Sequence, residues 1–226
     1  MDKKIATKNL DKLITKVEAA RLRISEHHIV KIIGISKYST ASDVATLYEA
    51  GQRAFGENKV QDLKDKKQEL DELPIEWHFV GTLQKNKINN LIDLNPTLIH
   101  SLDSLELAIE LNSKLEAKNK KLSALLQINS AYEDTKSGVM PKDAVEVYKQ
   151  IIETCPNIIL KGVMSIGAHS DDKKLIKQSF ETTKKIYDEL VPYGAKYCSM
   201  GMSGDFELAI ACGSNMIRVG SSLFKE

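Results

Sequence analysis

The sequence contains little cysteine and no long apolar run. Its three cysteines, Cys155, Cys198 and Cys212, are odd in number and widely spaced. This spacing suggests neither a disulfide framework nor a zinc site, so we expect a reducing, cytoplasmic location. No apolar stretch approaches the ~20 residues that a membrane-spanning helix needs. The N-terminus is followed by no long apolar run, so we expect no secretory signal and no membrane partner.

The chain also lacks an excess of charge of one sign. Lys and Arg number 32 against 31 Asp and Glu, which gives a net charge of +1. A dedicated nucleic-acid binder usually has a strong basic excess, so we expect no nucleic-acid partner. The five prolines are scattered singly, and no low-complexity linker interrupts the 226 residues. The sequence therefore predicts one domain over residues 1–226, with residues 1–28 as an N-terminal helix packed on it.

Short apolar runs alternate with helix-like segments along most of the chain. The expected strands are Val30–Ser36, Arg53–Gly56, Trp77–Gly81, Leu98–Ser101, Leu122–Asn129, Ile158–Ile166, Lys196–Met200 and Met216–Gly220. The expected helices between them are Ser42–Ala50, Lys59–Leu70, Lys85–Asp93, Leu105–Ala117, Lys142–Glu153, Leu175–Leu190 and Phe206–Cys212. Such alternation is typical of α/β proteins with parallel strands, either a closed barrel or an open doubly wound sheet.

Two features favour a single (β/α)8 barrel of the TIM type. Eight strands close such a barrel, and 226 residues lies within its size range. The sequence ends soon after the eighth run, which leaves no room for an eighth helix. An amphipathic segment from about Ile5 to Ser25 precedes the first run, and we expect this extra N-terminal helix to cover the gap.

The loops after the seventh and eighth runs are rich in glycine and serine. They are Met200–Gly204 and Gly220–Ser222. Sites in such barrels lie at the C-terminal strand ends, and these two loops often bind phosphate. Glycine lets the backbone approach an anion, and the helix that starts at Phe206 directs free N–H groups toward it. The alternative is that the glycines only form tight turns, but together the loops favour a phosphate site.

Alternation along the eighth run places Arg218 on the same face as Met216 and Gly220. If Ile217 and Val219 pack on the outer helices, Arg218 points into the barrel mouth. A buried guanidinium keeps its proton and needs an acceptor, which is either a ligand or a protein carboxylate.

The same alternation places Lys37 at the C-terminal rim of the first strand, on the face of Ile33 and Ile35. A lysine desolvated there has a lowered pKa and forms Schiff bases with carbonyls. The pattern by itself favours a rim lysine paired with a carboxylate such as Glu57. A carbonyl at Lys37, an acceptor at Arg218 and a phosphate together fit pyridoxal 5′-phosphate (PLP), whereas a sugar-phosphate aldolase substrate fits only the first and the third.

Several motifs occur in the order found in one known family. The most specific is Trp77–Lys87, which reads WHFVGTLQKNK; the others are Ile35–Lys37, Phe55–Asn58, Ser199–Asp205 and Arg218–Gly220, with a weaker match at Asn129 and Lys136–Gly138. In these segments the chain resembles the pyridoxal phosphate homeostasis proteins, whose fold is like the N-terminal barrel of alanine racemase. The resemblance spans roughly Val30 to Phe224.

The resemblance implies a role for each candidate site residue. Lys37 would carry PLP as an internal aldimine, Ser203, Gly220 and Ser221 would hold its phosphate, Arg218 would face the pyridine nitrogen and Asn58 would lie near the ring. Family members are monomeric, cytosolic proteins that keep free PLP at a safe level and hand it on, with apo PLP-dependent enzymes as candidate recipients. The chain departs from the family at Lys59, Asp62 and Lys225, where tyrosine, glutamate and glycine are usual.

The resemblance also implies a carrier without established turnover, and no catalytic residue or metal ligand is assigned. An arginine at the pyridine nitrogen keeps that nitrogen unprotonated, which weakens the ring as an electron sink. Racemases of this fold type use a second acid/base tyrosine from a C-terminal β-domain of the partner subunit, and we expect no such domain here. A PLP-dependent amino-acid racemase is the alternative.

Two further polar features are expected to be structural. His78 lies on a strand within the most specific motif, where a structural role is favoured over catalysis. The Lys-rich run Lys64–Lys67 is typical of a solvated helix face.

Overall fold

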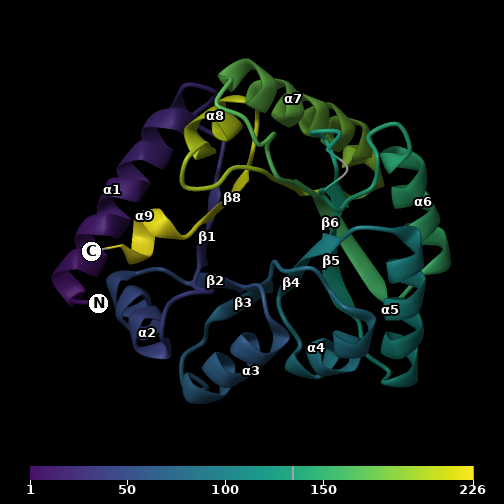
Figure 1. Cartoon of the computed structure of the whole chain (residues 1–226), viewed down its shortest axis with the longest axis horizontal. Coiled ribbons are helices and arrows are strands. Elements are labelled where there is room, and N and C mark those ends of the chain that lie inside the picture. The colour runs from purple at the N-terminus through teal and green to yellow at the C-terminus, as the bar shows by residue number, and fades with distance from the viewer. Residues whose placement is uncertain (134, 226) are drawn as a thin grey trace.

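The computed structural model describes residues 1–133 and 135–225, in which eight strands close into a barrel (Figure 1). The strands are β1 (Lys31–Ile35), β2 (Ala54–Glu57), β3 (Glu76–Phe79), β4 (Leu98–Leu102), β5 (Leu122–Ile128), β6 (Ile158–Ser165), β7 (Tyr197–Ser199) and β8 (Met216–Val219). Each strand pairs in parallel with the next one in sequence, and β8 pairs with β1. The predicted closed barrel is confirmed, and the open sheet is excluded.

Helices surround the barrel on its outside (Figure 1). They are α1 (Lys3–Leu22), α2 (Ala41–Ala50), α3 (Val60–Glu69), α4 (Ile88–Leu94), α5 (Leu105–Ala117), α6 (Ala144–Thr154), α7 (Lys173–Leu190), α8 (Phe206–Ala211) and α9 (Ser221–Phe224), with 3-10 turns at Lys85–Lys87 and Val191–Tyr193. Among the described residues, no helix is both long enough and apolar enough to cross a membrane.

The expectation that no helix follows the eighth strand was wrong, because α9 forms a single turn there. One helical turn needs only four residues, and the unpaired carbonyl oxygens at its C-terminal end accept hydrogen bonds from another helix. The Asn9 side-chain amide on α1 donates to the carbonyl oxygens of Leu223 (3.1 Å) and Lys225 (2.8 Å). Helix α1 also packs against α2 and α8, so it covers the gap as predicted.

The apolar core has two layers separated by the barrel wall. The larger layer lies between strands and helices and includes Ile217 and Val219. The smaller takes one residue from each of six strands: Ile33, Ala54, Leu98, Leu125, Met164 and Met216. Because successive strand residues point to opposite faces, this smaller layer fills the barrel interior. Arg218 shares the face of Met216, so its side chain lies inside the barrel as predicted.

Candidate functional site

The pairing of β1 with its neighbours brings candidate residues together at the barrel mouth. Ile35 on β1 pairs with Gly56 on β2, and Lys37 and Asn58 each follow two residues later, beyond the carboxyl ends of these strands. On the other side of β1, Gly220 directly follows β8. It lies close to β1, because a Cβ on Gly220 would be 3.2 Å from the carbonyl oxygen of Ile35. Three of the predicted site residues therefore follow three adjacent strands.

Arg218 is buried under the mouth and is held by neutral oxygens. Its Nη1 donates to the carbonyl oxygen (2.9 Å) and the Oγ (2.7 Å) of Ser199, and its Nη2 donates to the carbonyl oxygen of Ser165 (2.8 Å). No carboxylate among the described residues forms an ion pair with it, so the predicted alternative of a protein carboxylate is wrong within this part of the chain. Burial lowers the pKa of Arg218 to about 10, which leaves the side chain charged at neutral pH.

Lys37 lies in the turn after β1, where its side chain is exposed rather than desolvated. Its Nζ lies 4.9 Å from the centre of the Tyr38 ring. The sequence pattern favoured a pair between Lys37 and Glu57, and this prediction was wrong. The fully buried Glu57 instead accepts hydrogen bonds through Oε1 from Ser36 Oγ (2.5 Å) and Lys66 Nζ (2.6 Å).

The prediction that Lys66 belongs to a solvated helix face was therefore wrong. Val60 and Leu63 form the buried face of α3, and Lys66 follows at the same helical spacing. Its side chain is 12% exposed and also donates to the carbonyl oxygen of Ser36 (2.7 Å). The long apolar stem of lysine allows the ammonium group to reach the buried carboxylate from the barrel's outer side.

The two predicted phosphate loops are in contact. Ser203 Oγ accepts from the backbone N–H groups of Gly220 (3.3 Å) and Ser222 (3.4 Å). Ser221 is exposed at the start of α9. Gly201 has φ +95°, and a Cβ there would lie 2.7 Å from that of Ala209, so both its conformation and its contact require glycine. The Ser203 hydroxyl thus joins the two loops at one edge of the mouth.

The motif Trp77–Lys87 has a role in bringing β2 and β3 together. Val80 N–H donates to the carbonyl oxygen of Glu57 (2.8 Å). A Cβ on Gly81 would lie 1.9 Å from the carbonyl oxygen of Asn58, so only glycine allows the chains to pass there. The position of Asn58 at the mouth therefore depends on Gly81.

The barrel interior also contains a pair of histidines, of which the sequence singled out only His78. His78 Nδ1 lies 2.9 Å from His100 Nε2, and both rings are buried. Burial lowers the pKa of His78 and lowers that of His100 further. A contact to His78 Nε2 at 3.9 Å and an ion pair with Lys31 lower the pKa of Glu76 to about 2. Alternation from Leu98 along β4 would have placed His100 inside as well.

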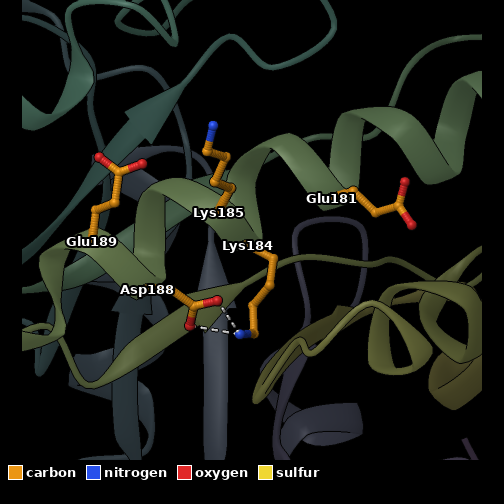
Figure 2. Close-up of a pocket in the computed structure, with 5 residues that line it drawn as sticks. All are labelled: Glu181, Lys184, Lys185, Asp188 and Glu189. Carbon is orange, nitrogen blue, oxygen red and sulfur yellow. Dashed lines mark hydrogen bonds and ion pairs between the residues drawn. The ribbon is translucent and has the colours of Figure 1, made fainter.

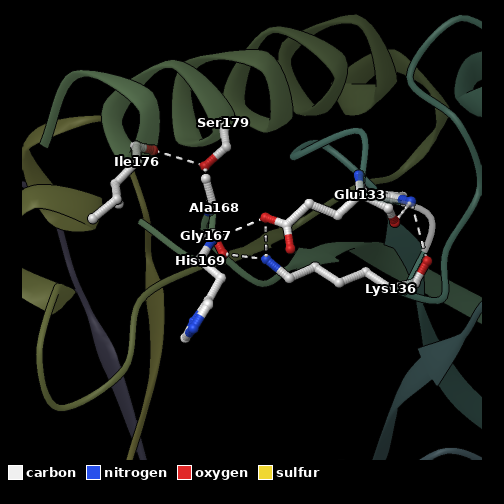
Figure 3. A network of polar contacts seen from close by, with 8 residues as sticks. Glu133, Lys136, Gly167, Ala168, His169, Ile176 and Ser179 are labelled. Atoms are coloured by element: carbon white, nitrogen blue, oxygen red, sulfur yellow. Dashed lines mark hydrogen bonds and ion pairs between the residues drawn. The ribbon is translucent and has the colours of Figure 1, made fainter. Parts of the chain in front are cut away.

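The opposite side of the mouth is formed by the β5–α6 loop, which is tied to the β6–α7 loop (Figure 3). Lys136 Nζ donates to Glu133 Oε1 (2.9 Å) and to the carbonyl oxygen of Gly167 (2.8 Å). The His169 N–H donates to the same carboxylate (2.9 Å), and this bond and Lys136 lower the pKa of Glu133. The Asn129 amide donates to the carbonyl oxygens of Glu133 and Lys136. The weakest sequence motif thus forms a connection between loops.

A hollow on the outer surface of α7 is unrelated to the mouth (Figure 2). It is lined by Glu181, Lys184, Lys185, Asp188 and Glu189. All five residues belong to the single helix α7, and Lys184 Nζ is paired with Asp188 at 2.6 Å. The hollow gathers no side chains from different strands, so we do not consider it a functional site.

Known proteins resemble this chain over nearly its whole length. Residues 9–226 match the family described as "Alanine racemase, N-terminal domain". A pyridoxal phosphate homeostasis protein of Helicobacter pylori is 57% identical over 96% of this chain and 97% of its own. PipY of Synechococcus elongatus, solved with PLP bound, is 30% identical with a TM-score of 0.81 and covers 97% and 99%. An unknown protein from Bifidobacterium adolescentis has a TM-score of 0.91 at 29% identity, covering 99% and 97%.

Proposed function

The chain belongs to the pyridoxal phosphate homeostasis proteins, and from that membership we propose that it binds PLP at the barrel mouth and takes part in PLP homeostasis. One observation carries the proposal. An amine, a buried guanidinium and a cluster of anion donors lie at the ends of three adjacent strands, at Lys37, Arg218 and Ser203 with Gly220. PLP carries an aldehyde, a pyridine nitrogen and a phosphate, which are complementary to these three groups.

The residues present fit the cofactor chemically. Ser203 and Ser221 carry hydroxyl groups that can donate to the phosphate, and the Gly220 N–H, which donates to Ser203 Oγ in this structure, lies beside them. Arg218 remains protonated at neutral pH, so it can only donate to the pyridine nitrogen and thereby keeps that nitrogen unprotonated. Asn58, which follows β2 as Lys37 follows β1, would lie near the ring. When bound, PLP supplies an electrophilic aldehyde and a conjugated ring.

We propose Lys37 as the covalent attachment point. Its amine attacks the aldehyde carbon, a C=N bond forms, and one water molecule leaves, which gives an aldimine. In the structure the ammonium group lies over Tyr38, so the side chain has to turn toward the mouth. An exposed cation–π contact contributes only about 0.5–1 kcal/mol, so this rotation is inexpensive.

We propose a carrier rather than an enzyme. An unprotonated pyridine nitrogen weakens the ring as an electron sink, and racemisation also needs an acid/base group on each face of the substrate carbon. Lys37 supplies one such group at the most. The alternative is a PLP-dependent amino-acid racemase, and the observation that supports it is the match to the alanine racemase N-terminal domain family.

Borohydride reduction of the purified, PLP-loaded protein tests the attachment. We expect an aldimine absorbance, and a reduced pyridoxyl adduct that peptide mass mapping places on Lys37. Lys37→Ala removes the adduct, whereas Lys59→Ala, another exposed lysine at the mouth, keeps it. A colourless protein without an adduct on Lys37 contradicts the proposal. Loss of optical rotation of an L-amino acid, at a rate proportional to protein concentration, favours the racemase instead.

The expected setting of the protein is also part of the proposal. We propose that residues 1–226 fold as one domain, that the protein is a cytoplasmic monomer, and that it passes PLP to apo PLP-dependent enzymes. Light scattering after gel filtration measures the mass of the particle. Reactivation of an apo-enzyme by the loaded protein, compared with free PLP, measures the transfer.

A further inference from the structure

A cavity of about 250 Å³ lies between α1 and the two phosphate loops. It is lined by Asn9, Lys12, Leu13, Lys16, Ser203, Phe206, Ser221, Ser222 and Lys225. Ser203 and Ser221 are two of the three residues proposed to hold the phosphate, so the cavity adjoins that site directly. Its volume is below that of pockets for drug-sized ligands but suits a single anionic group with its water.

The walls of this cavity are basic. Three lysines line it, and none of its described lining residues is acidic. Lys16 is engaged with Glu207 on α8, with its Nζ 3.2 Å from the carboxylate. Lys12 on α1 and Lys225 after α9 also line the cavity. Among the described residues, neither lysine forms an ion pair with a carboxylate, whereas Lys16 does. Their charges are therefore available to an anion.

Hydroxyl groups and lysines are brought together here by the packing of α1 on α9. The Asn9 bonds to the carbonyl oxygens of Leu223 and Lys225 fix the two elements, and Lys12 lies one helical turn from Asn9 on the same face. An anion bound to Ser221 and Ser222 would thus share its cavity with Lys12 and Lys225. In a partly enclosed cavity, two such charges strengthen the binding of a dianion more than they would in open water.

We propose that Lys12 and Lys225 form the outer wall of the phosphate site and select ligands that carry a phosphate dianion. The N-terminal helix is then part of the binding site as well as a cover for the barrel. This inference rests on the proposed function for the identity of the phosphate-bearing ligand.

Inorganic phosphate is the probe that tests the cavity by itself. In a titration of the isotope-labelled protein at constant ionic strength, we expect saturable amide shifts at Ser203, Ser221 and Ser222. Lys12→Gln and Lys225→Gln should each raise the phosphate Kd by about two- to fivefold, as expected for one partly exposed charge. Lys8→Gln, an exposed lysine on the same helix outside the cavity, is the matched control and should leave the Kd unchanged.

A second arm compares PLP with pyridoxal, which has the same ring and aldehyde but no phosphate. Lys12→Gln should weaken PLP binding and leave pyridoxal binding unchanged. Equal phosphate affinities in Lys12→Gln, Lys225→Gln and Lys8→Gln, or no shifts at the three serines, overturn the inference even if the adduct on Lys37 forms. Lysine-dependent phosphate binding in a protein that takes up no PLP supports the cavity and contradicts the proposed function.

Discussion

Arg218 and the His78–His100 pair lie inside the same barrel, and they respond to burial in opposite ways. Arg218 keeps its charge because three oxygens of Ser199 and Ser165 accept its hydrogen bonds. The His78 and His100 rings contact each other, and burial lowers the pKa of both, which favours their neutral forms. A positive charge is therefore retained at Arg218, where a ligand is expected, whereas charge is suppressed at the two histidines in the same barrel interior.

Glu57 and Lys66 provide a third case, in which two buried charges satisfy each other. Glu57 Oε1 binds both Lys66 and Ser36, whereas its Oε2 has no hydrogen-bond partner among the described residues. The difference from Arg218 lies in the source of compensation. The charge of Glu57 is compensated by one cation, Lys66 on the outer helix α3. The charge of Arg218 is stabilised by hydrogen bonds to several neutral oxygens of the barrel wall.

Removing that cation should have the largest effect. Lys66→Met leaves the Glu57 carboxylate buried and uncompensated, so we expect a loss of about 3–5 kcal/mol in the free energy of unfolding at neutral pH. Denaturant unfolding measures it, with the exposed Lys64→Met on the same helix as the control. Adding Glu57→Gln to Lys66→Met should recover part of the loss. Equal stability of Lys66→Met and Lys64→Met would contradict this account of the pair.

Replacing Arg218 should have a smaller effect, because its partners are neutral. Arg218→Met fills a similar volume but leaves the carbonyl oxygens of Ser165 and Ser199 without a donor, at a cost of about 1–3 kcal/mol in unfolding free energy. Calorimetry and denaturant unfolding measure the loss. If Arg218→Met destabilises the protein more than Lys66→Met does, the distinction between the two modes of compensation fails.

The His78–His100 pair should have the smallest effect on the free energy of unfolding at neutral pH. Its destabilising effect should grow as the pH falls. Above pH ~6.5 both rings are neutral in the folded and the unfolded chain, so they contribute nothing to the pH dependence. Below this pH the unfolded chain binds protons that the folded rings resist, so stability falls by up to about 1.4 kcal/mol per pH unit for each ring. Unfolding measured between pH 7 and pH 5 gives the slope.

The matched variant is His100→Asn, which removes the ring with the more strongly lowered pKa and should reduce the slope. Imidazole resonances of the wild type provide a check that does not depend on how well this variant folds. The pKa values of His78 and His100 should both lie below the ordinary value of imidazole, with His100 the lower. Protonation of either ring near its ordinary pKa would remove the contrast with Arg218.

The sequence predicted the barrel and the inward side chain of Arg218 because both follow from alternation along single strands. It mispredicted Lys66 because the run Lys64–Lys67 contains no information about which lysine reaches a carboxylate on another element. It missed α9 because a one-turn helix is stabilised by Asn9, more than two hundred residues away. The sequence also did not predict that Lys37 is exposed, because the conformation of a turn depends on contacts with neighbouring loops.

The contact between α1 and α9 has a consequence for the order of folding. Asn9 binds carbonyl oxygens 214 and 216 positions further along the chain. Contacts across so long a separation form late, because the intervening loop has to close before they contribute. During synthesis α1 leaves the ribosome before the barrel strands, and its apolar face at Leu10 and Leu13 has no closed barrel to cover until β8 is complete. We therefore expect closure of the barrel to be the final folding event, and nascent chains to need protection from aggregation until then.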